Sequence, residues 1–398
     1  MTVQATFAHL NHRFSIEDPV FATHFEDAIE YLIQGCPVAH SPVGSGLTVF
    51  NRYRDVRRIG QDWKTFSSAD GWMMDPPDGN LPILPEDCDP PYHTAWRQVL
   101  NPFFNAAAVA ELEGAARRYA AELIDAFVDR GECDYIAEFA AKLPGLVLFR
   151  HILPVPLADL PALFRDIDTY SFGPIAERAP AFGRVHDYLE EFLRACEASA
   201  PADGLPAVLL AGVMRDGAPC SWADKVSTAL DVVFGGLATT THAMAGAMYE
   251  MARSRDVREA VMADAECLRT AVEETVRLYA PVVMVARSVR ADTEVGGVRL
   301  QAGERVAINF AAASRDPEVC AAPREFDVRR NEVVHTAFGI GPHRCIGEHL
   351  ARLEIRIAIE EFLRRIPDVA IAAGGEPVFE SGQLRTMTRL RLAWSVRV

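Results

Sequence analysis

One cysteine of the chain lies in a glycine-rich segment whose spacing suits metal chemistry. Residues 338–347 read FGIGPHRCIG, which places three glycines around Cys345. Glycine permits positive φ and lets the backbone approach a flat cofactor closely. We expect a helix to begin at Gly347, so that free amide groups and the positive end of the helix dipole lie near the sulfur and favour its thiolate form. A thiolate is one of the few protein ligands of haem iron, and it favours O–O cleavage. The segment therefore predicts an iron ligand at Cys345.

The other seven cysteines carry no such pattern. They stand far apart, with no CxxC pair and no clustered histidines of a zinc site, at positions 36, 88, 133, 196, 220, 267 and 320. We interpret them as small buried or incidental thiols and expect no disulfide framework.

At every fixed position, residues 338–347 resemble the FGxGxHxCxG signature of bacterial cytochrome P450 monooxygenases. The resemblance implies a mainly α, triangular fold with a minor β part around a buried haem b. It implies that Phe338, Gly339 and Gly347 border the haem beside Cys345. It extends over essentially the whole chain, so we expect a single domain spanning residues 1–398 with its haem-thiolate loop at 338–347.

The run from Asp231 to Thr241 contains paired glycines and three threonines, and both features weaken a helix. The resemblance implies that the helix expected over about 221–253 crosses the distal haem face. Small residues there make room for O2, and an acid followed by threonine delivers protons. Thr239 matches the alcohol. Ala238 stands where the family carries the acid, and this departure puts the usual proton relay in doubt.

Glu274 and Arg277 lie three residues apart and so share one helical face. They resemble the buried Glu-x-x-Arg pair of the family, whose role is structural. The family completes this network with an arginine before phenylalanine in a Pro-x-Arg-Phe element. Here residues 323–326 read PREF, so the third partner is left open between Arg324, Arg329 and no residue.

Haem carries two propionates that need charged or hydrogen-bonding partners when buried. His93 and Arg97 are four residues apart and share a helical face. By resemblance, the residues that contact propionates are His93, Arg97, Arg287, His335 and His343. Without the motif context, each could equally be a solvated surface group.

Helical spacing places Asp231, Phe234, Gly235, Ala238 and Thr239 near one face. If this face lines a pocket, Phe234 offers a ring surface and Asp231 a polar contact; otherwise Phe234 is ordinary core and Asp231 lies near water. The other predicted walls are Trp72, Met73, Met74, Ile83, Leu84, Val283, Val285 and Met387. Because these walls are apolar, we expect a small or medium hydrophobic substrate, aromatic molecules included.

The elements that must position these residues follow from hydrophobic periodicity. Helices are expected over 55–62, 94–104, 107–130, 158–171, 184–200, 221–253, 256–279 and 347–366. Short strands are expected over 47–50, 295–300 and 305–309, and residues 69–91 form a long loop rich in Pro, Gly and Asp.

Composition limits the classes of protein that remain. Of 398 residues, 49% are hydrophobic and 24% charged, which excludes a disordered chain. A net charge of −15 argues against binding to nucleic acid or to anionic membranes. No uninterrupted apolar run is long enough to span a bilayer, and the first residues lack a signal-peptide pattern. We expect a cytoplasmic monomer.

Together, the Cys345 segment and the family resemblance predict a haem-thiolate monooxygenase that inserts one oxygen atom of O2 into its substrate. Since we find no flavin or iron–sulfur segment, the electrons are expected from a separate ferredoxin served by an NAD(P)H-dependent reductase. One alternative is a peroxygenase driven by hydrogen peroxide, which needs no ferredoxin. A second is a non-enzymatic haem-thiolate sensor, against which Thr239 and the apolar pocket speak.

Overall fold

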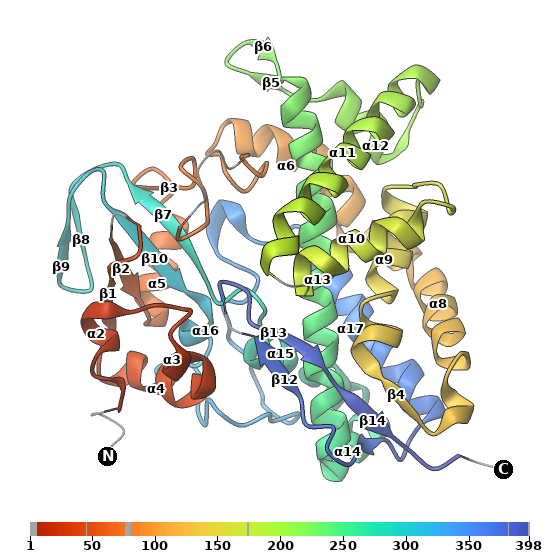
Figure 1. The fold of residues 1–398 in the computed structure, drawn as a ribbon. Coiled ribbons are helices and arrows are strands. Elements are labelled where there is room, and N and C mark those ends of the chain that lie inside the picture. Colours follow the sequence, from red (N-terminus) through yellow and green to blue (C-terminus); the bar gives the residue numbers. More distant parts are fainter. Residues whose placement is uncertain (1–5, 45, 76–80, 173–174, 381, 397–398) are drawn as a thin grey trace.

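The computed structural model describes residues 6–44, 46–75, 81–172, 175–380 and 382–396. It is mainly α with a minor β part, which confirms the predicted fold class (Figure 1). The first helices and strands are α2 (Leu10–Arg13), α3 (Pro19–Thr23), α4 (Phe25–Gln34), β1 (Val38–Ser41), β2 (Leu47–Phe50), α5 (Tyr53–Gln61) and β3 (Phe66–Ser67). The helical part up to the long central helix comprises α6 (Tyr92–Phe104), α7 (Ala106–Glu111), α8 (Glu113–Asp125), η1 (Val128–Arg130), η2 (Ile136–Ala140), α9 (Leu143–Val147), η3 (Leu148–Ile152), α10 (Leu160–Phe172), α11 (Ile175–Ser199) and α12 (Gly204–Ala211).

A five-stranded sheet joins segments from both ends of the chain. Its order is β1-β2-β10-β7-β3, with β7 at Met284–Val289 and β10 at Arg305–Asn309. Strand β10 runs parallel to β2, with Val306 opposite Thr48, and antiparallel to β7, with Val306 opposite Arg287. Every residue of β7 is buried. This register holds Arg287 on a strand covered on both faces.

The described residues also form smaller strand groups. A three-stranded sheet has the order β11 (Ala370–Ile371), β14 (Arg391–Ala393) and β4 (Glu132–Asp134). The two-stranded sheets are β12 (Val378–Glu380) with β13 (Thr386–Arg389), β5 (Met214–Arg215) with β6 (Ala218–Pro219), and β8 (Thr293–Val295) with β9 (Val298–Leu300).

Helix α13 (Trp222–Arg253) runs through the middle of the molecule, with the sheet on one side and α8 on the other (Figure 1). A capping box fixes its start: Ser221 accepts a bond from the Asp224 N–H, and the Asp224 carboxylate accepts one from the Ser221 N–H. The helix remains continuous through Gly235 and Gly236. Packing on both sides thus outweighs the low helix propensity of these residues.

The last helices complete the frame around α13. They are α14 (Arg255–Ala263), α15 (Ala265–Leu278), α16 (Phe310–Ala313), η4 (Gly341–His343) and α17 (Glu348–Arg365). Helix α17 packs against α13 and α8. None of the helices in the described part of the chain is at once long and apolar enough to cross a membrane.

Four expected elements differ from the structure. The helix predicted over 184–200 begins earlier, as α11 starts at Ile175. The helix predicted over 256–279 is two helices, because the Asp264 side chain caps α15 by accepting a bond from the Glu266 N–H. The strand predicted over 295–300 is the β8–β9 hairpin, which turns at Gly296 and Gly297 with positive φ. The helix predicted over 107–130 divides into α7, α8 and η1.

Candidate functional site

The loop before α17 brings Cys345 back toward the start of its own segment. The Cys345 N–H donates to the carbonyl of Phe338 at 2.7 Å, and the Gly339 N–H donates to that of Thr336 at 2.8 Å. Gly347 is the N-cap of α17, and its N–H donates to the Cys345 sulfur. The expected helix start therefore lies at the sulfur.

Two glycines of the loop serve different contacts, both with positive φ of +73°. A Cβ on Gly339 would stand 3.2 Å from the His343 carbonyl oxygen, inside the loop itself. A Cβ on Gly341 would stand 2.2 Å from the carbonyl oxygen of Gly60 in α5. The close approach at Gly341 is thus to the protein backbone of α5.

Burial dominates the titration of Cys345. Desolvation raises the pKa of the thiol to about 12, although the hydrogen bond from the Gly347 N–H acts in the opposite direction. The Gly347 N–H at the helix start thus favours the thiolate, in the direction expected from the sequence, but burial has the larger effect on the pKa. A cation bound directly to the sulfur would lower the pKa further.

Three of the residues predicted to hold propionates converge beside this loop. Arg97 of α6 donates from Nη1 to the carbonyl of Arg344 at 2.7 Å. The rings of His93 and His343 lie 4.3 Å apart, centroid to centroid. Burial lowers the pKa of His93 to about 4 and that of His343 to about 2, with Arg97 adding to both effects. Both rings are neutral at physiological pH.

Arg287 of β7 acts electrostatically on the same two histidines, His93 and His343. Its side chain is buried and donates from Nη1 to the carbonyl of Ala286 at 2.7 Å. Burial lowers its pKa, while Glu86 acts most strongly in the opposite direction. Burial raises the pKa of Glu86 in turn, whereas the positive charges of Arg287 and Arg97 act to lower it. Sequence reasoning missed Glu86, which no motif distinguishes from the other acids of its loop.

His335 is placed differently from the other predicted propionate contacts. Its Nε2 lies 3.1 Å from a carboxylate oxygen of Glu273, and its Nδ1 accepts the Ala337 N–H at 3.3 Å. The guanidinium of Arg352 also binds Glu273, at 2.6 Å, and stacks over the Phe338 ring. Both ring nitrogens of His335 thus have protein partners.

Glu274 and Arg277 form a fully buried, bidentate pair with N–O distances of 2.6 and 2.9 Å. The third partner is Arg330, whose Nε donates to Glu274 at 3.0 Å. Neither arginine considered from the sequence takes this place, because Arg324 pairs with Asp27 in α4. Arg277 also binds the carbonyls of Pro323 and Glu325. The network ties the segment after α16 to α15.

On α13, the hydroxyl of Thr239 donates to the carbonyl of Gly235 at 2.7 Å. This bond uses the hydroxyl proton and leaves the oxygen able to accept another hydrogen bond. Ala238 is buried and carries no ionisable group. A Cβ added to Gly235 would meet no atom within 4 Å, so space adjoins the helix at this turn.

Phe234 lies one residue before that space and packs against two other aromatic rings. Its centroid is 4.6 Å from that of Tyr170 in α10 and 5.3 Å from that of Phe182 in α11. Asp231, one turn earlier, has its pKa raised well above the ordinary value, by burial first and by Glu86 second. The helix face predicted to line a pocket therefore combines aromatic rings with one carboxyl group.

The other predicted pocket walls fall into separate hydrophobic clusters. Met74 and Val283 pack with the N-terminal helices α2 to α4. Trp72 and Val285 pack with α5 and the sheet. Leu84 and Met387 pack in the main helical core with α13. Met73 binds Arg305 through its carbonyl, and the Ile83 N–H donates to Asp87. Of this set, Leu84 and Met387 belong to one cluster, against which Phe234 also packs.

The residues present fit a haem on three observations. Within the described ranges, His343 Nδ1, His343 Nε2 and His93 Nδ1 are buried polar atoms with no hydrogen-bond partner, and the N–H of each neutral ring could donate to a propionate. The Cys345 sulfur is held in a loop with one amide donor and no protein cation bonded to it among the residues described. Gly235 leaves open space on α13.

Comparison with known proteins gives a consistent result. A family model described as cytochrome P450 matches residues 148–367. A steroid C26-monooxygenase of Mycobacterium tuberculosis is 34% identical, over 83% of this chain and 89% of the relative. A probable cytochrome P450 127A1 of Sinorhizobium fredii is 30% identical, over 91% and 87% respectively. The crystal structure of CYP108D1 from Novosphingobium aromaticivorans superposes with a TM-score of 0.81 at 27% identity, over 94% of this chain and 96% of that one.

Proposed function

The chain belongs to the cytochrome P450 family, and on this basis we propose that it inserts one oxygen atom of O2 into a small or medium hydrophobic substrate. It is a monooxygenase with haem b as its prosthetic group. The observation that carries the proposal is the Cys345 loop, in which the sulfur accepts a bond from the Gly347 N–H at the start of α17.

We assign the axial ligand to Cys345 and the propionate contacts to His93, Arg97, Arg287 and His343. When bound, haem supplies the iron at which O2 is activated. The neutral imidazoles of His93 and His343 would each donate a hydrogen bond, and the two arginines would supply charge. His335 remains a proposed neighbour of the haem that acts through Glu273 and Arg352.

Thr239 is the proposed catalytic hydroxyl of the distal side. Its proton is donated to Gly235, so its oxygen is oriented to accept a hydrogen bond from a water or from a bound substrate. Ala238 has no side-chain group that can carry a proton. The Thr241 hydroxyl is already engaged with the carbonyl oxygens of Leu237, at 2.9 Å, and Ala140, at 3.1 Å. Proton delivery is therefore proposed to run through Thr239, Thr240, ordered water or a polar group of the substrate.

The substrate is proposed to lie against the aromatic cluster of Tyr170, Phe182 and Phe234. Rings on three helices favour a rigid apolar molecule, either aromatic or polycyclic. The relative named as a steroid C26-monooxygenase makes a steroid the first compound to try. Binding is measured as the shift of the haem spectrum from low to high spin during titration with steroids, monoterpenes and alkylbenzenes. If none of these three classes shifts the spectrum, the hydrophobic-substrate proposal fails.

The electron source is proposed to be a separate ferredoxin with an NAD(P)H-dependent reductase, acting on a cytoplasmic monomer. The competing function is a peroxygenase, which Ala238 favours because a reaction that starts from hydrogen peroxide requires fewer delivered protons. The test compares product formed with ferredoxin, reductase and NADPH against product formed with hydrogen peroxide alone. Faster turnover with peroxide than with the reconstituted electron chain would favour the peroxygenase.

A further inference from the structure

Helix α13 is buried along most of its length but keeps one open face. Between residues 226 and 248, a stretch that the structure describes in full, the residues that are not buried are Asp231, Phe234, Gly235, Gly236 and Thr239. They recur at helical spacing and so lie on one side of α13. Because α13 runs through the middle of the molecule and a Cβ on Gly235 would meet no atom within 4 Å, this side borders an internal space. Asp231 is the one ionisable residue among those five.

The loop that carries Glu86 is fastened to α13 one turn before Asp231. The Leu84 N–H donates to the Ser227 hydroxyl oxygen at 2.9 Å, and that hydroxyl donates to the carbonyl of Pro82. Asp231 follows Ser227 by four residues and so lies on the same side of the helix. Among the described residues, Glu86 is the charged group that acts most strongly on Asp231. The two carboxyl groups are therefore neighbours at one end of the open face.

Glu86 and Asp231 have no hydrogen-bond partners of their own, unlike the next acid of the loop. Asp87 accepts the N–H groups of Trp72 and Ile83, at 2.9 and 2.8 Å. Within the part of the chain that the structure describes, the carboxyl groups of Glu86 and Asp231 have neither a hydrogen bond nor an ion pair. Asp87 thus holds the loop together, whereas the other two side chains are left for a ligand.

The charged groups around this pair leave its negative charge uncompensated. Arg97 of α6 and Arg287 of β7 act on Glu86, but both are assigned to haem propionates, which would take up their positive charge. Asp87 adds a further negative charge. Burial raises the pKa of both Glu86 and Asp231, and their mutual repulsion adds to the effect on Asp231. A bound cation would favour the ionised forms instead.

Aromatic rings continue the open face beyond the carboxyl pair. Phe234 follows Asp231 by three residues, and its ring packs against those of Tyr170 and Phe182. The faces of aromatic rings attract cations as well as apolar groups. An apolar molecule with one positive charge matches this combination, because its charge meets the carboxyl pair and its body meets the rings.

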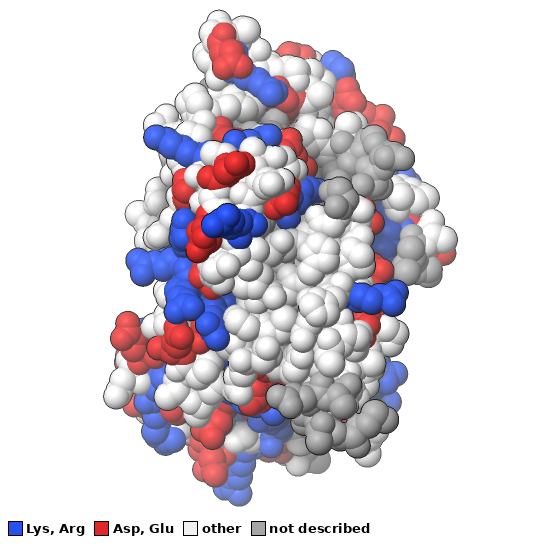
Figure 2. Space-filling view, turned by 90° about the vertical axis from the view of Figure 1, so that its left-hand side faces the viewer, with Lys and Arg blue, Asp and Glu red and all other residues white. Residues whose placement is uncertain are grey.

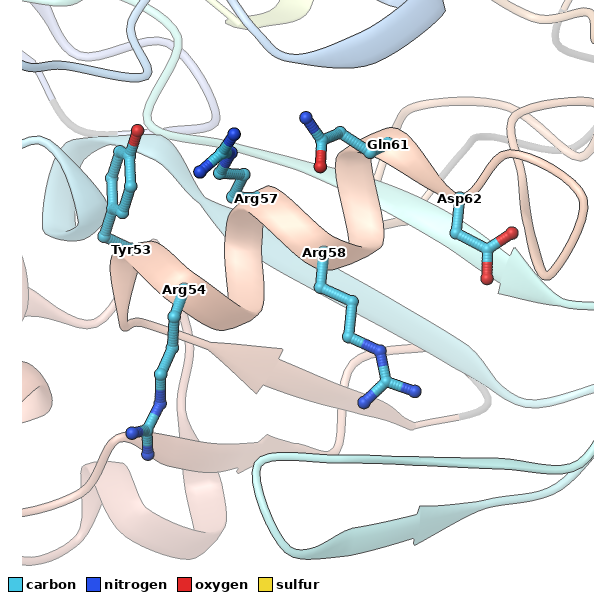
Figure 3. A pocket seen from close by; sticks show the side chains of 6 residues that line it. All are labelled: Tyr53, Arg54, Arg57, Arg58, Gln61 and Asp62. Atoms are coloured by element: carbon cyan, nitrogen blue, oxygen red, sulfur yellow. The ribbon is translucent and has the colours of Figure 1, made fainter.

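Positive charge gathers on the outside of the molecule. The side that carries the sheet shows Lys and Arg along one edge, while its middle is largely uncharged (Figure 2). A shallow hollow of about 550 Å³ on α5 has Arg54, Arg57 and Arg58 among its walls (Figure 3). Because a hollow lined by arginines repels cations, it does not compete with the open face of α13 for a positively charged ligand.

We infer that Asp231 and Glu86 bind the positively charged nitrogen of a hydrophobic amine, and so select the substrate. The inference rests on the proposed function and names the substrate class of that same site. Thr239 lies eight residues beyond Asp231, or roughly 12 Å along the helix axis. A substrate held by its nitrogen at Asp231 therefore presents to Thr239 a carbon at its opposite end.

The test uses the haem-loaded protein and two probes of one shape. The first is a phenylbutyl trimethylammonium ion, whose quaternary nitrogen neither titrates nor binds iron. The second is its neutral isostere, with carbon in place of nitrogen. The variants are Asp231→Asn and Glu86→Gln, and the matched control carries Asp129→Asn and Glu122→Gln, two exposed acids of η1 and α8. Binding is measured from pH 6 to 8 by calorimetry and by the low-to-high-spin shift.

We expect the parent at pH 8 to bind the cation about tenfold more tightly than the isostere, and each single variant to lose most of this preference. The Kd of the cation should fall as pH rises, because the carboxyl pair releases a proton when the cation binds. The control should keep both properties. Asp231→Glu retains the charge and should retain the preference. Equal affinity of the parent for cation and isostere at every pH would overturn the inference.

A protonated pair that donates hydrogen bonds to a neutral substrate is the competing explanation. A phenylbutyl ketone is therefore titrated as a third probe, and ketone binding that is tighter than that of the cation and weakens as pH rises would refute the ammonium site. Failure of the proposed function looks different. In that case neither the cation nor the isostere shifts the haem spectrum of the parent, and the inference fails together with the function on which it rests.

Discussion

At the scale of single residues, the site contains buried polar groups whose burial without a partner costs free energy of folding. The Cys345 thiol resists ionisation, and His93 and His343 are buried with nitrogens that lack partners among the described residues. An iron porphyrin with two carboxylates would offer a cation to the sulfur and acceptors to the ring N–H groups, so its binding would stabilise the folded protein.

Cys345→His tests the iron ligand. We expect the reduced, CO-bound parent to show the red-shifted Soret band of a thiolate-ligated haem, and the variant to lose it, because imidazole donates less charge to iron. The measurement is a CO difference spectrum. A red-shifted band that persists in the variant would disprove the assignment of Cys345.

Arg97→Ala tests the propionate contact. Loss of a charged hydrogen bond of about 1.5–3 kcal/mol should weaken haem retention by about tenfold or more. The readout is haem transfer to apomyoglobin. Arg97→Lys is the control, because it keeps the charge but loses the bond to the Arg344 carbonyl. Unchanged transfer rates in Arg97→Ala would remove this role.

Thr239→Ala tests proton delivery. We expect more hydrogen peroxide released for each NAD(P)H consumed, since the proposed proton route loses the Thr239 hydroxyl. Thr239→Ser keeps the hydroxyl and should stay close to the parent. Ala238→Asp should not improve coupling, because burial at this position favours the neutral acid. Coupling that is the same in Thr239→Ala and in the parent would place the peroxygenase first.

At the scale of elements, the site depends on how closely backbones approach one another. The thiolate loop meets α5 at Gly341 and Gly60, and the segment after α16 is held to α15 by Arg277 and Arg330. The position of the iron ligand is thus determined by neighbouring elements as well as by its own loop.

Gly341→Ala tests the contact with α5. The new methyl group collides with the Gly60 carbonyl oxygen, so we expect a loss of more than about 2 kcal/mol of unfolding free energy and a lower haem content. Gly374→Ala controls for positive φ alone, because its Cβ would meet no atom within 4 Å. Equal melting temperatures for the two variants would show that the clash is relieved at no cost.

The sequence predicts the elements with local signals and misses contacts made across the fold. Ser221 and Asp224 set the start of α13, and its predicted span differs from the observed one by a single residue. Nothing local marks Arg330 as the partner of Glu274, because the two lie 56 residues apart. Glu86 and the contact of Gly341 with Gly60 are invisible for the same reason. The hydrophobic periodicity also continues through Asp264, so it does not reveal that the Asp264 side chain caps the start of a new helix, α15.

At the scale of the whole molecule, stability is linked to protons held in the interior. Glu354 of α17 is 1% exposed, and neither carboxylate oxygen has a hydrogen-bond partner within the described residues. Burial raises its pKa well above the usual value. The folded protein therefore holds a proton that the unfolded chain releases above about pH 4.3, and this group's contribution falls as pH rises toward the folded pKa.

Glu354→Gln should remove that dependence. We expect the stability of the variant relative to the parent to increase by up to about 1.4 kcal/mol for each pH unit between about pH 5 and the folded pKa. Thermal unfolding is measured from pH 5 to 8, with the exposed Glu111→Gln as control. Parallel stability curves for parent and Glu354→Gln would mean that the buried carboxyl is already ionised.

The order of strands in the main sheet has a consequence during synthesis on the ribosome. Strand β2 pairs with β10, whose first residue follows Leu47 by 258 positions. At about 5–20 residues per second, the β1–β2 hairpin waits roughly 10–50 s for its parallel partner to be translated. Throughout that time one hydrogen-bonding edge of β2 is uncovered, and such an edge invites pairing with another nascent chain. Chains truncated before Arg305 should therefore aggregate through their N-terminal hairpin, whereas the helical segments that follow it can begin to pack as they emerge.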